Sequence, residues 1–166
     1  MRQFILLASL ITLALPVHAQ KAHVHGEGKL EIVIDKGNIS INLELPLDVA
    51  VGFERAPKND KEKAALAAAQ KALGESALFI PTPAANCKAD PPKLTLPTFS
   101  GKHDHDAHAD IDASYVFRCA NPAALKSIET GIFKNFGRLY RLETQRAGPG
   151  GQGATRLTPK NPMISW

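Results

Sequence analysis

The sequence predicts an α+β fold: a single domain of mainly antiparallel sheet, with one longer alanine-rich helix, several short helices and a His/Asp-rich loop. Three observations lead to this class. Apolar and polar residues alternate in several short segments, as they do in strands with one buried face. One alanine-rich stretch carries the start and stop signals of a helix. The segments also lack the regular strand and helix alternation of a parallel sheet.

The first two alternating segments predict a β-hairpin. Residues 35–38, Asp-Lys-Gly-Asn, form the expected turn between them, and Pro46 follows the second segment. The apolar side chains recur at every second position, so they should share one buried face: Leu30, Ile32, Ile34, Ile39, Ile41, Leu43 and Leu45.

The alanine-rich stretch predicts a helix that ends at Leu73. Asn59 or Asp60 can cap its start, Glu62 has the position of the acidic residue in a capping box, and Gly74 stops it. The abundance of alanine suggests that this helix packs closely on the sheet. Five prolines between residues 81 and 97 then predict an irregular region.

The C-terminal half predicts further short elements. A strand is expected at 113–119, with Tyr115 and Phe117 on the same face as Cys119. Asn121-Pro122 should open a short helix. Residues 128–133 form either a strand or the lead into a helical turn that ends at Gly137. Two strands, at 139–145 and 154–157, complete the chain.

The glycine-rich run at 148–153 has the spacing of a dinucleotide-binding fingerprint. Such a loop must open a helix whose N-terminus faces the phosphates. Here Thr155, Leu157 and Thr158 continue as strand and turn before Pro159. The run is therefore interpreted as a tight connection between strands.

The N-terminus has the pattern of a secretory signal peptide at residues 1–19. Arg2 precedes an apolar stretch at 4–15, Pro16 breaks it, and small residues occupy the cleavage positions. The stretch is shorter than the roughly 20 residues of a membrane span, and no membrane insertion is expected. We expect a periplasmic mature domain at 20–166, with a cleavable rather than a retained N-terminus.

The two cysteines are consistent with export, because an even number in a secreted chain usually forms a bridge. Cys87 and Cys119 are thus expected to form a disulfide. Thiolate metal ligation is the alternative. Removal of Arg2 with the signal lowers the formal charge by one, from +4 to +3. Such a scattered, modest excess does not indicate nucleic-acid binding.

Five of the six histidines fall into two clusters that indicate metal binding. Imidazole and carboxylate groups are ligands for zinc and related metals, and residues two apart in an extended segment project to one side. The candidate metal ligands are His23, His25, His103, His105, His108, Asp104, Asp106 and Asp110. The second cluster lies in an expected loop at about 100–111.

Sequence leaves open whether the two clusters share one ion or form separate sites. A tetrahedral zinc site needs four donors, and only the fold can bring the clusters together. A solvated polar loop without metal and a pH sensor are further alternatives, because histidine titrates near pH 6.5.

Nearly every element of the mature chain resembles, in order, the ZrgA type of periplasmic zinc-binding proteins. The segments that carry the resemblance are 23–30, 51–57, the histidine run, 115–122, 151–154 and 157–159. The resemblance implies zinc binding in support of a zinc ABC importer. Two departures are visible: the histidine run is short, and Arg55 stands where relatives often carry histidine. Because a guanidinium cannot ligate a metal, Glu54 beside it is left out of the expected ligands.

We therefore expect a periplasmic protein that captures or delivers zinc in zinc import and homeostasis, with an importer or its periplasmic binding protein as partner. Copper or nickel binding is a variant of this expectation. The sequence carries no HExxH helix or other hydrolase signature, so no enzyme is expected. The alternative of another class is a structural or envelope-interaction domain with incidental histidines.

Overall fold

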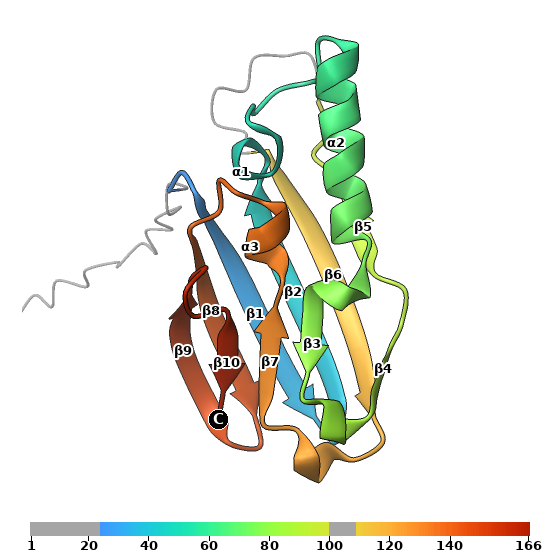
Figure 1. Cartoon of the computed structure of the whole chain (residues 1–166), viewed down its shortest axis with the longest axis vertical. Coiled ribbons are helices and arrows are strands. Elements are labelled where there is room, and N and C mark those ends of the chain that lie inside the picture. Colours follow the sequence, from blue (N-terminus) through green and yellow to red (C-terminus); the bar gives the residue numbers. More distant parts are fainter. Residues whose placement is uncertain (1–23, 100–108) are drawn as a thin grey trace, which may run out of the picture.

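The structure is a computed structural model that describes residues 24–99 and 109–166. Two sheets dominate it (Figure 1). The larger one has seven strands in the order β4-β6-β2-β1-β8-β9, with β5 also paired to β6. Its strands are β1 (Glu27–Asp35), β2 (Asn38–Pro46), β4 (Cys87–Ala89), β5 (Lys93–Thr95), β6 (Asp110–Cys119), β8 (Arg141–Gly148) and β9 (Gly151–Leu157).

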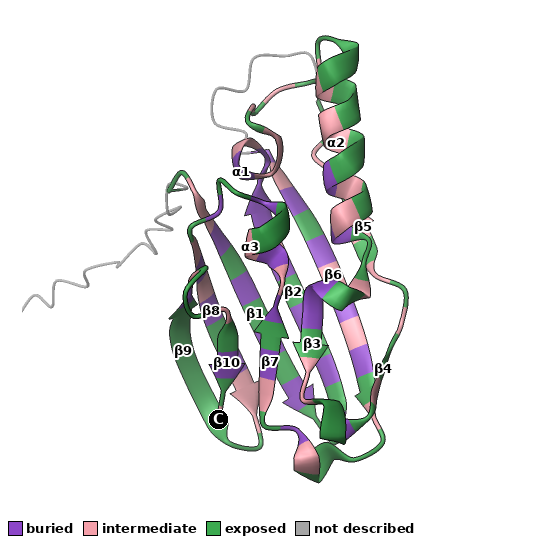
Figure 2. Ribbon diagram, viewed as in Figure 1, coloured by how far each residue is buried: buried purple, intermediate pink, exposed green. Residues whose placement is uncertain are grey.

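The larger sheet is antiparallel except where β1 lies parallel to β8. The first two strands form the predicted hairpin, in which Ile32 pairs with Ile41 and Asp35 pairs with Asn38. All seven apolar side chains of its predicted inner face are buried. Burial alternates along the strands (Figure 2), so one face of the sheet carries the core and the other is open.

The remaining elements cover the core face of the larger sheet (Figure 1). They include a smaller sheet in the order β10-β7-β3. Its strands are β3 (Phe79–Pro81), β7 (Ser127–Thr130) and β10 (Met163–Ser165), and the α-helices are α1 (Leu47–Val51), α2 (Asp60–Leu73) and α3 (Ile132–Asn135). Three 3₁₀ turns complete the set: η1 (Ser76–Leu78), η2 (Pro83–Ala85) and η3 (Pro122–Ala124). This arrangement is an α+β domain with mostly antiparallel sheet.

Helix α2 begins at the Asn59 cap, whose side chain accepts a hydrogen bond from the Glu62 backbone at 2.9 Å. Only Ala69 and Leu73 of this helix are buried, because its N-terminal part extends beyond the end of the sheet (Figure 1). It thus packs less extensively than its alanine content suggested. The buried Tyr115 hydroxyl donates to the Leu73 carbonyl at 2.8 Å and fixes the other end of the helix.

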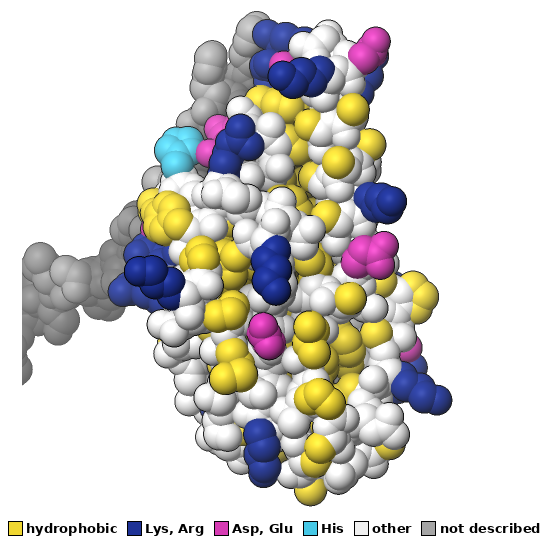
Figure 3. Space-filling view, in the orientation of Figure 1, with side chains coloured by type: hydrophobic (Ala, Val, Ile, Leu, Met, Phe, Trp, Pro, Cys, Tyr) yellow, Lys and Arg dark blue, Asp and Glu magenta, His cyan; other side chains and the backbone are white. Residues whose placement is uncertain are grey.

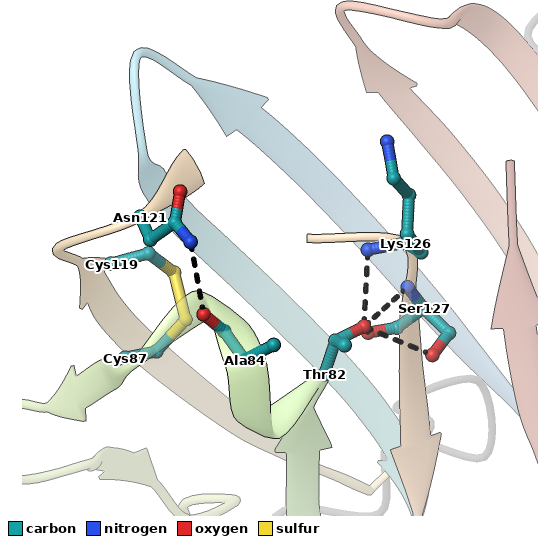
Figure 4. Close-up of a disulfide and its surroundings, with 7 residues drawn as sticks. All are labelled: Thr82, Ala84, Cys87, Cys119, Asn121, Lys126 and Ser127. Carbon is teal, nitrogen blue, oxygen red and sulfur yellow. Dashed lines mark hydrogen bonds between the residues drawn. A yellow bond between two sulfur atoms is a disulfide. The ribbon is translucent and has the colours of Figure 1, made fainter. Parts of the chain in front are cut away.

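The predicted disulfide between Cys87 and Cys119 is present and joins two paired residues of β4 and β6 (Figure 4). Next to it, Asn121-Pro122 opens a short helix as expected, although the Asn121 side chain makes no capping hydrogen bond. Its side-chain amide instead donates to the Ala84 carbonyl at 3.2 Å, and the turn that follows is the 3₁₀ turn η3. At the same end of the molecule, the Thr82 hydroxyl accepts hydrogen bonds from the backbone amides of Ser127 and Lys126 (Figure 4).

Three expectations about the elements differ from the structure. The proline-rich region contains short strands, β4 and β5 among them, because their hydrogen-bond partners lie on β6. Residues 128–133 belong to both a strand, β7, and a helical turn, α3. A further strand, β10, follows the strand expected to be last. The glycine-rich run forms a tight connection between β8 and β9, as expected, but only residues 149–150 form its turn, because β9 already begins at Gly151; no helix follows it.

Candidate metal site

The candidate site lies at one end of the larger sheet, where the chain enters β1 and leaves β2 into α1 (Figure 1). His25 lies two residues before the first residue of β1, and its side chain is 83% exposed. Its Nδ1 atom lies 2.6 Å from Asp48 Oδ2. This hydrogen bond raises the pKa of His25, with smaller contributions from the charges of Asp48 and Glu54.

Asp48 is held in place by the short helix α1. Leu47 and Val49, its neighbours in the chain, are buried in the core, and Asp48 itself is half-buried. While Asp48 Oδ2 faces His25, Asp48 Oδ1 is buried and has no hydrogen-bond partner among the described residues. A buried carboxylate oxygen without a donor is costly, and a bound cation would compensate that cost.

Glu54 is the third member of the site. The chain leaves α1 through Gly52, whose amide donates to the Asp48 carbonyl at 2.8 Å, and then presents Glu54. One ligand atom from each of His25, Asp48 and Glu54 lies within 4.8 Å of the other two. Figure 3 shows a histidine beside acidic side chains on the surface of the molecule.

Arg55 points away from this site, although it follows Glu54 directly. Its guanidinium donates to the two carboxylate oxygens of Glu62 at 2.7 and 2.9 Å and lies over the ring of Phe53. The Arg55 hydrogen bonds lower the pKa of Glu62 to about 2. Arg55 therefore pairs with Glu62 rather than with Glu54, so Glu54 is free to face His25 and Asp48.

One imidazole and two carboxylates form a donor set that suits zinc. Around a tetrahedral zinc ion with bonds near 2.0–2.2 Å, neighbouring ligand atoms lie about 3.4 Å apart. The spacing in the site requires only small side-chain adjustments to reach this value. A fourth donor or a water molecule would complete the coordination. The chemistry of these donors fits zinc.

The structure tests the position of only some predicted ligands. His25 is part of the site. His23, His103, His105, His108, Asp104 and Asp106 lie outside the described residues, as does the predicted signal peptide. Asp110 is described at the start of β6, where it pairs with Pro46, and it is not a member of the three-residue group.

Two members of the site, Asp48 and Glu54, were not among the predicted ligands. Asp48 is a lone acidic residue in the apolar segment 46–51, which is an unusual place for a charge. That feature is the only local signal that marked it. Glu54 had no signal of its own, because its approach to His25 depends on α1 and on the turn after it.

The fold and the site together define a β-rich domain with a surface histidine and carboxylate cluster of metal-binding type. The family model "ZrgA family zinc uptake protein" matches residues 22–166, and the chain belongs to this family. Family membership indicates a role in zinc uptake, and the family is not an enzyme family. No curated protein matches the chain. Within residues 24–99 and 109–166, no helix is long and apolar enough to cross a membrane.

Proposed function

We propose that this protein binds zinc in the periplasm at His25, Asp48 and Glu54 and delivers it for import. The observation that carries the proposal is the convergence of these three side chains within 4.8 Å, together with the buried Asp48 oxygen that lacks a donor among the described residues. The family and the disulfide support an extracytoplasmic location. The proposal includes cleavage of residues 1–19 and a mature domain at 20–166.

Further donors in this proposal come from the two histidine clusters. His23 precedes His25 by two residues. At the other cluster, Ala109 follows His108 directly, and its carbonyl accepts a hydrogen bond of 2.8 Å from Leu47, the neighbour of Asp48. This contact supports a contribution from His103, His105 and His108, with Asp104, Asp106 and Asp110, to capture at the same end of the sheet.

The exposed position of the site is suited to the transfer of zinc to another protein. His25 and Glu54 are exposed, so zinc can be passed to another protein without unfolding of this one. A donor set of few residues, completed by donors that must be ordered on binding, favours moderate affinity and release to a tighter receptor. A zinc ABC importer or its periplasmic binding protein is the partner in this proposal. Copper and nickel use the same donors and are the competing metals.

The test is a zinc titration by calorimetry on protein purified from the periplasm after export, with copper and nickel as competitors. The wild type should bind zinc saturably, and His25→Ala and Glu54→Gln should each weaken binding by about tenfold or more. Glu75→Gln is the matched control, since Glu75 is an exposed acidic residue outside the site. Equal zinc binding by all four proteins would refute the site and favour an envelope-interaction domain with incidental histidines.

A further inference from the structure

Two of the three site residues lie on segments that turn through a left-handed glycine. Gly26, with φ +82°, directly follows His25, and Gly52, with φ +90°, ends α1 two residues before Glu54. Other residues rarely adopt this conformation, so both segments have a specific backbone path. That path directs the two side chains toward Asp48.

One further segment, the connection between α3 and β8, contacts both glycines. The Tyr140 amide donates to the Gly26 carbonyl at 2.9 Å. The Tyr140 ring lies so close over Gly26 that a Cβ there would lie 2.3 Å from Tyr140 Cε1. The Arg138 guanidinium lies in the same way over Gly52, where a Cβ would lie 2.9 Å from Arg138 Nη2.

The α3 to β8 connection is itself firmly anchored. Leu139 is 2% exposed, and its amide donates to the Phe136 carbonyl at 2.9 Å. The Tyr140 hydroxyl donates to Glu27 Oε1 at 2.9 Å, and Arg141 forms an ion pair with the same carboxylate. These contacts lie where β1 and β8 begin their parallel pairing. The contacts on the two glycines therefore come from a fixed part of the sheet.

We infer that Arg138 and Tyr140 are positioning residues of the proposed zinc site. They hold the segments of His25 and Glu54 close enough for both side chains to bind one zinc ion. This inference rests on the proposed function and adds residues that touch no metal. A segment that is ordered before zinc arrives does not lose its conformational freedom on binding, so the affinity is higher. Removal of the Tyr140 ring or of the Arg138 guanidinium should increase the mobility of the segment that it contacts.

The experiment compares zinc affinity and cobalt absorption spectra of the full exported protein and its variants. Arg138→Ala and Tyr140→Ala should each weaken zinc binding by about tenfold, as expected when one or two side chains must be ordered on binding. Both should also change the visible cobalt spectrum, which reports ligand geometry. Tyr140→Phe keeps the ring over Gly26 and should retain near wild-type affinity. Lys134→Ala, a cationic residue on α3 outside this contact, is the control.

A double-mutant comparison separates positioning from a general loss of stability. In the Glu54→Gln background, Arg138→Ala should have little further effect on zinc affinity, because it acts through the segment that carries Glu54. An undiminished effect there, or unchanged zinc affinity and cobalt spectra in both Arg138→Ala and Tyr140→Ala, would overturn the inference. If His25→Ala and Glu54→Gln leave zinc binding intact, the proposed function itself fails.

Discussion

The contact of 2.6 Å between His25 Nδ1 and Asp48 Oδ2 would link the proposed zinc binding to the protonation of His25. Asp48 stabilises the protonated imidazole and so raises the pKa of His25. Zinc would need the neutral imidazole, so an ion bound at the proposed site must displace any proton that His25 carries. In the proposed zinc site, one proton and one metal ion therefore compete for the His25 imidazole.

The pH dependence of zinc binding follows from this competition. Zinc affinity should fall as pH drops through the raised pKa of His25, and it should begin to fall at a higher pH than for an isolated histidine near 6.5. Calorimetric titrations across a pH series, in buffers of different ionisation enthalpy, would measure both the affinity and the protons released. Affinity that stays constant from pH 8 to about pH 5.5 would contradict a role of His25 in binding.

The stability that His25 gives to the metal-free protein changes with pH in the opposite direction from the zinc affinity. Because the folded pKa of His25 is raised, the His25 and Asp48 pair contributes stability that is fully present below the unfolded pKa and is lost as pH rises through the folded value. His25→Ala should therefore lower the melting temperature more in acid than at alkaline pH, measured with a chelator present.

The effect of the Asp48 charge on zinc affinity can be separated from the effect of the shape of its side chain. Asp48→Asn keeps the size of the side chain and a hydrogen bond to His25 but removes the negative charge. Zinc affinity should fall by about tenfold or more, as for other carboxylates that ligate or orient a histidine ligand. Competition with a chromophoric chelator measures this, with Glu75→Gln as control. Zinc affinity equal to that of the control would exclude Asp48 from the site.

At the scale of elements, the disulfide connects the edge strand β4 to β6. The bridge spans 32 positions of the chain and encloses the His/Asp-rich run. It lies beside the turns η2 and η3, far along β6 from Asp110, which begins that strand near α1. The bridge therefore stabilises the end of the sheet opposite the candidate metal site.

Loss of this bridge should affect stability more than metal binding. Replacing both cysteines by serine should lower the free energy of unfolding by about 3 to 4 kcal/mol, the chain-entropy value for a loop of this length. Urea unfolding of the oxidised wild type and the double variant would measure it. Under conditions where both are folded, zinc affinity should be the same, and a large loss of affinity would show that the bridge organises the site.

Particular elements show how far sequence patterns predict this fold. The hairpin of β1 and β2, the capped start of α2 and the tight connection between β8 and β9 depend on neighbouring residues, and all three were predicted. Strands β4, β5 and β10 pair with distant partners and were missed. The same division applies to the site, because His25 belongs to a local motif while Asp48 and Glu54 join it through tertiary contacts.

For the whole molecule, the His/Asp-rich run is proposed to add metal donors without contributing to the core. The two buried layers are formed by the strands and helices of residues 24–99 and 109–166. Replacing His103, His105 and His108 together by alanine should lower zinc stoichiometry or affinity and leave the zinc-free melting temperature unchanged. Thermal melts in chelator and calorimetry would test both parts. Unfolding of the metal-free variant would show that the run supports the core.

The sequence by itself determined the class of fold, the disulfide partners and the family, and it pointed to one histidine of the candidate site, because each of these depends on residue types and on local spacing. Tertiary structure decided which carboxylates face that histidine. Asp48 and Glu54 lie 23 and 29 residues after His25, and only the return of β2 beside β1, followed by α1 and its left-handed Gly52, brings them together. Such contacts depend on the packing of whole strands, which no short segment of sequence specifies.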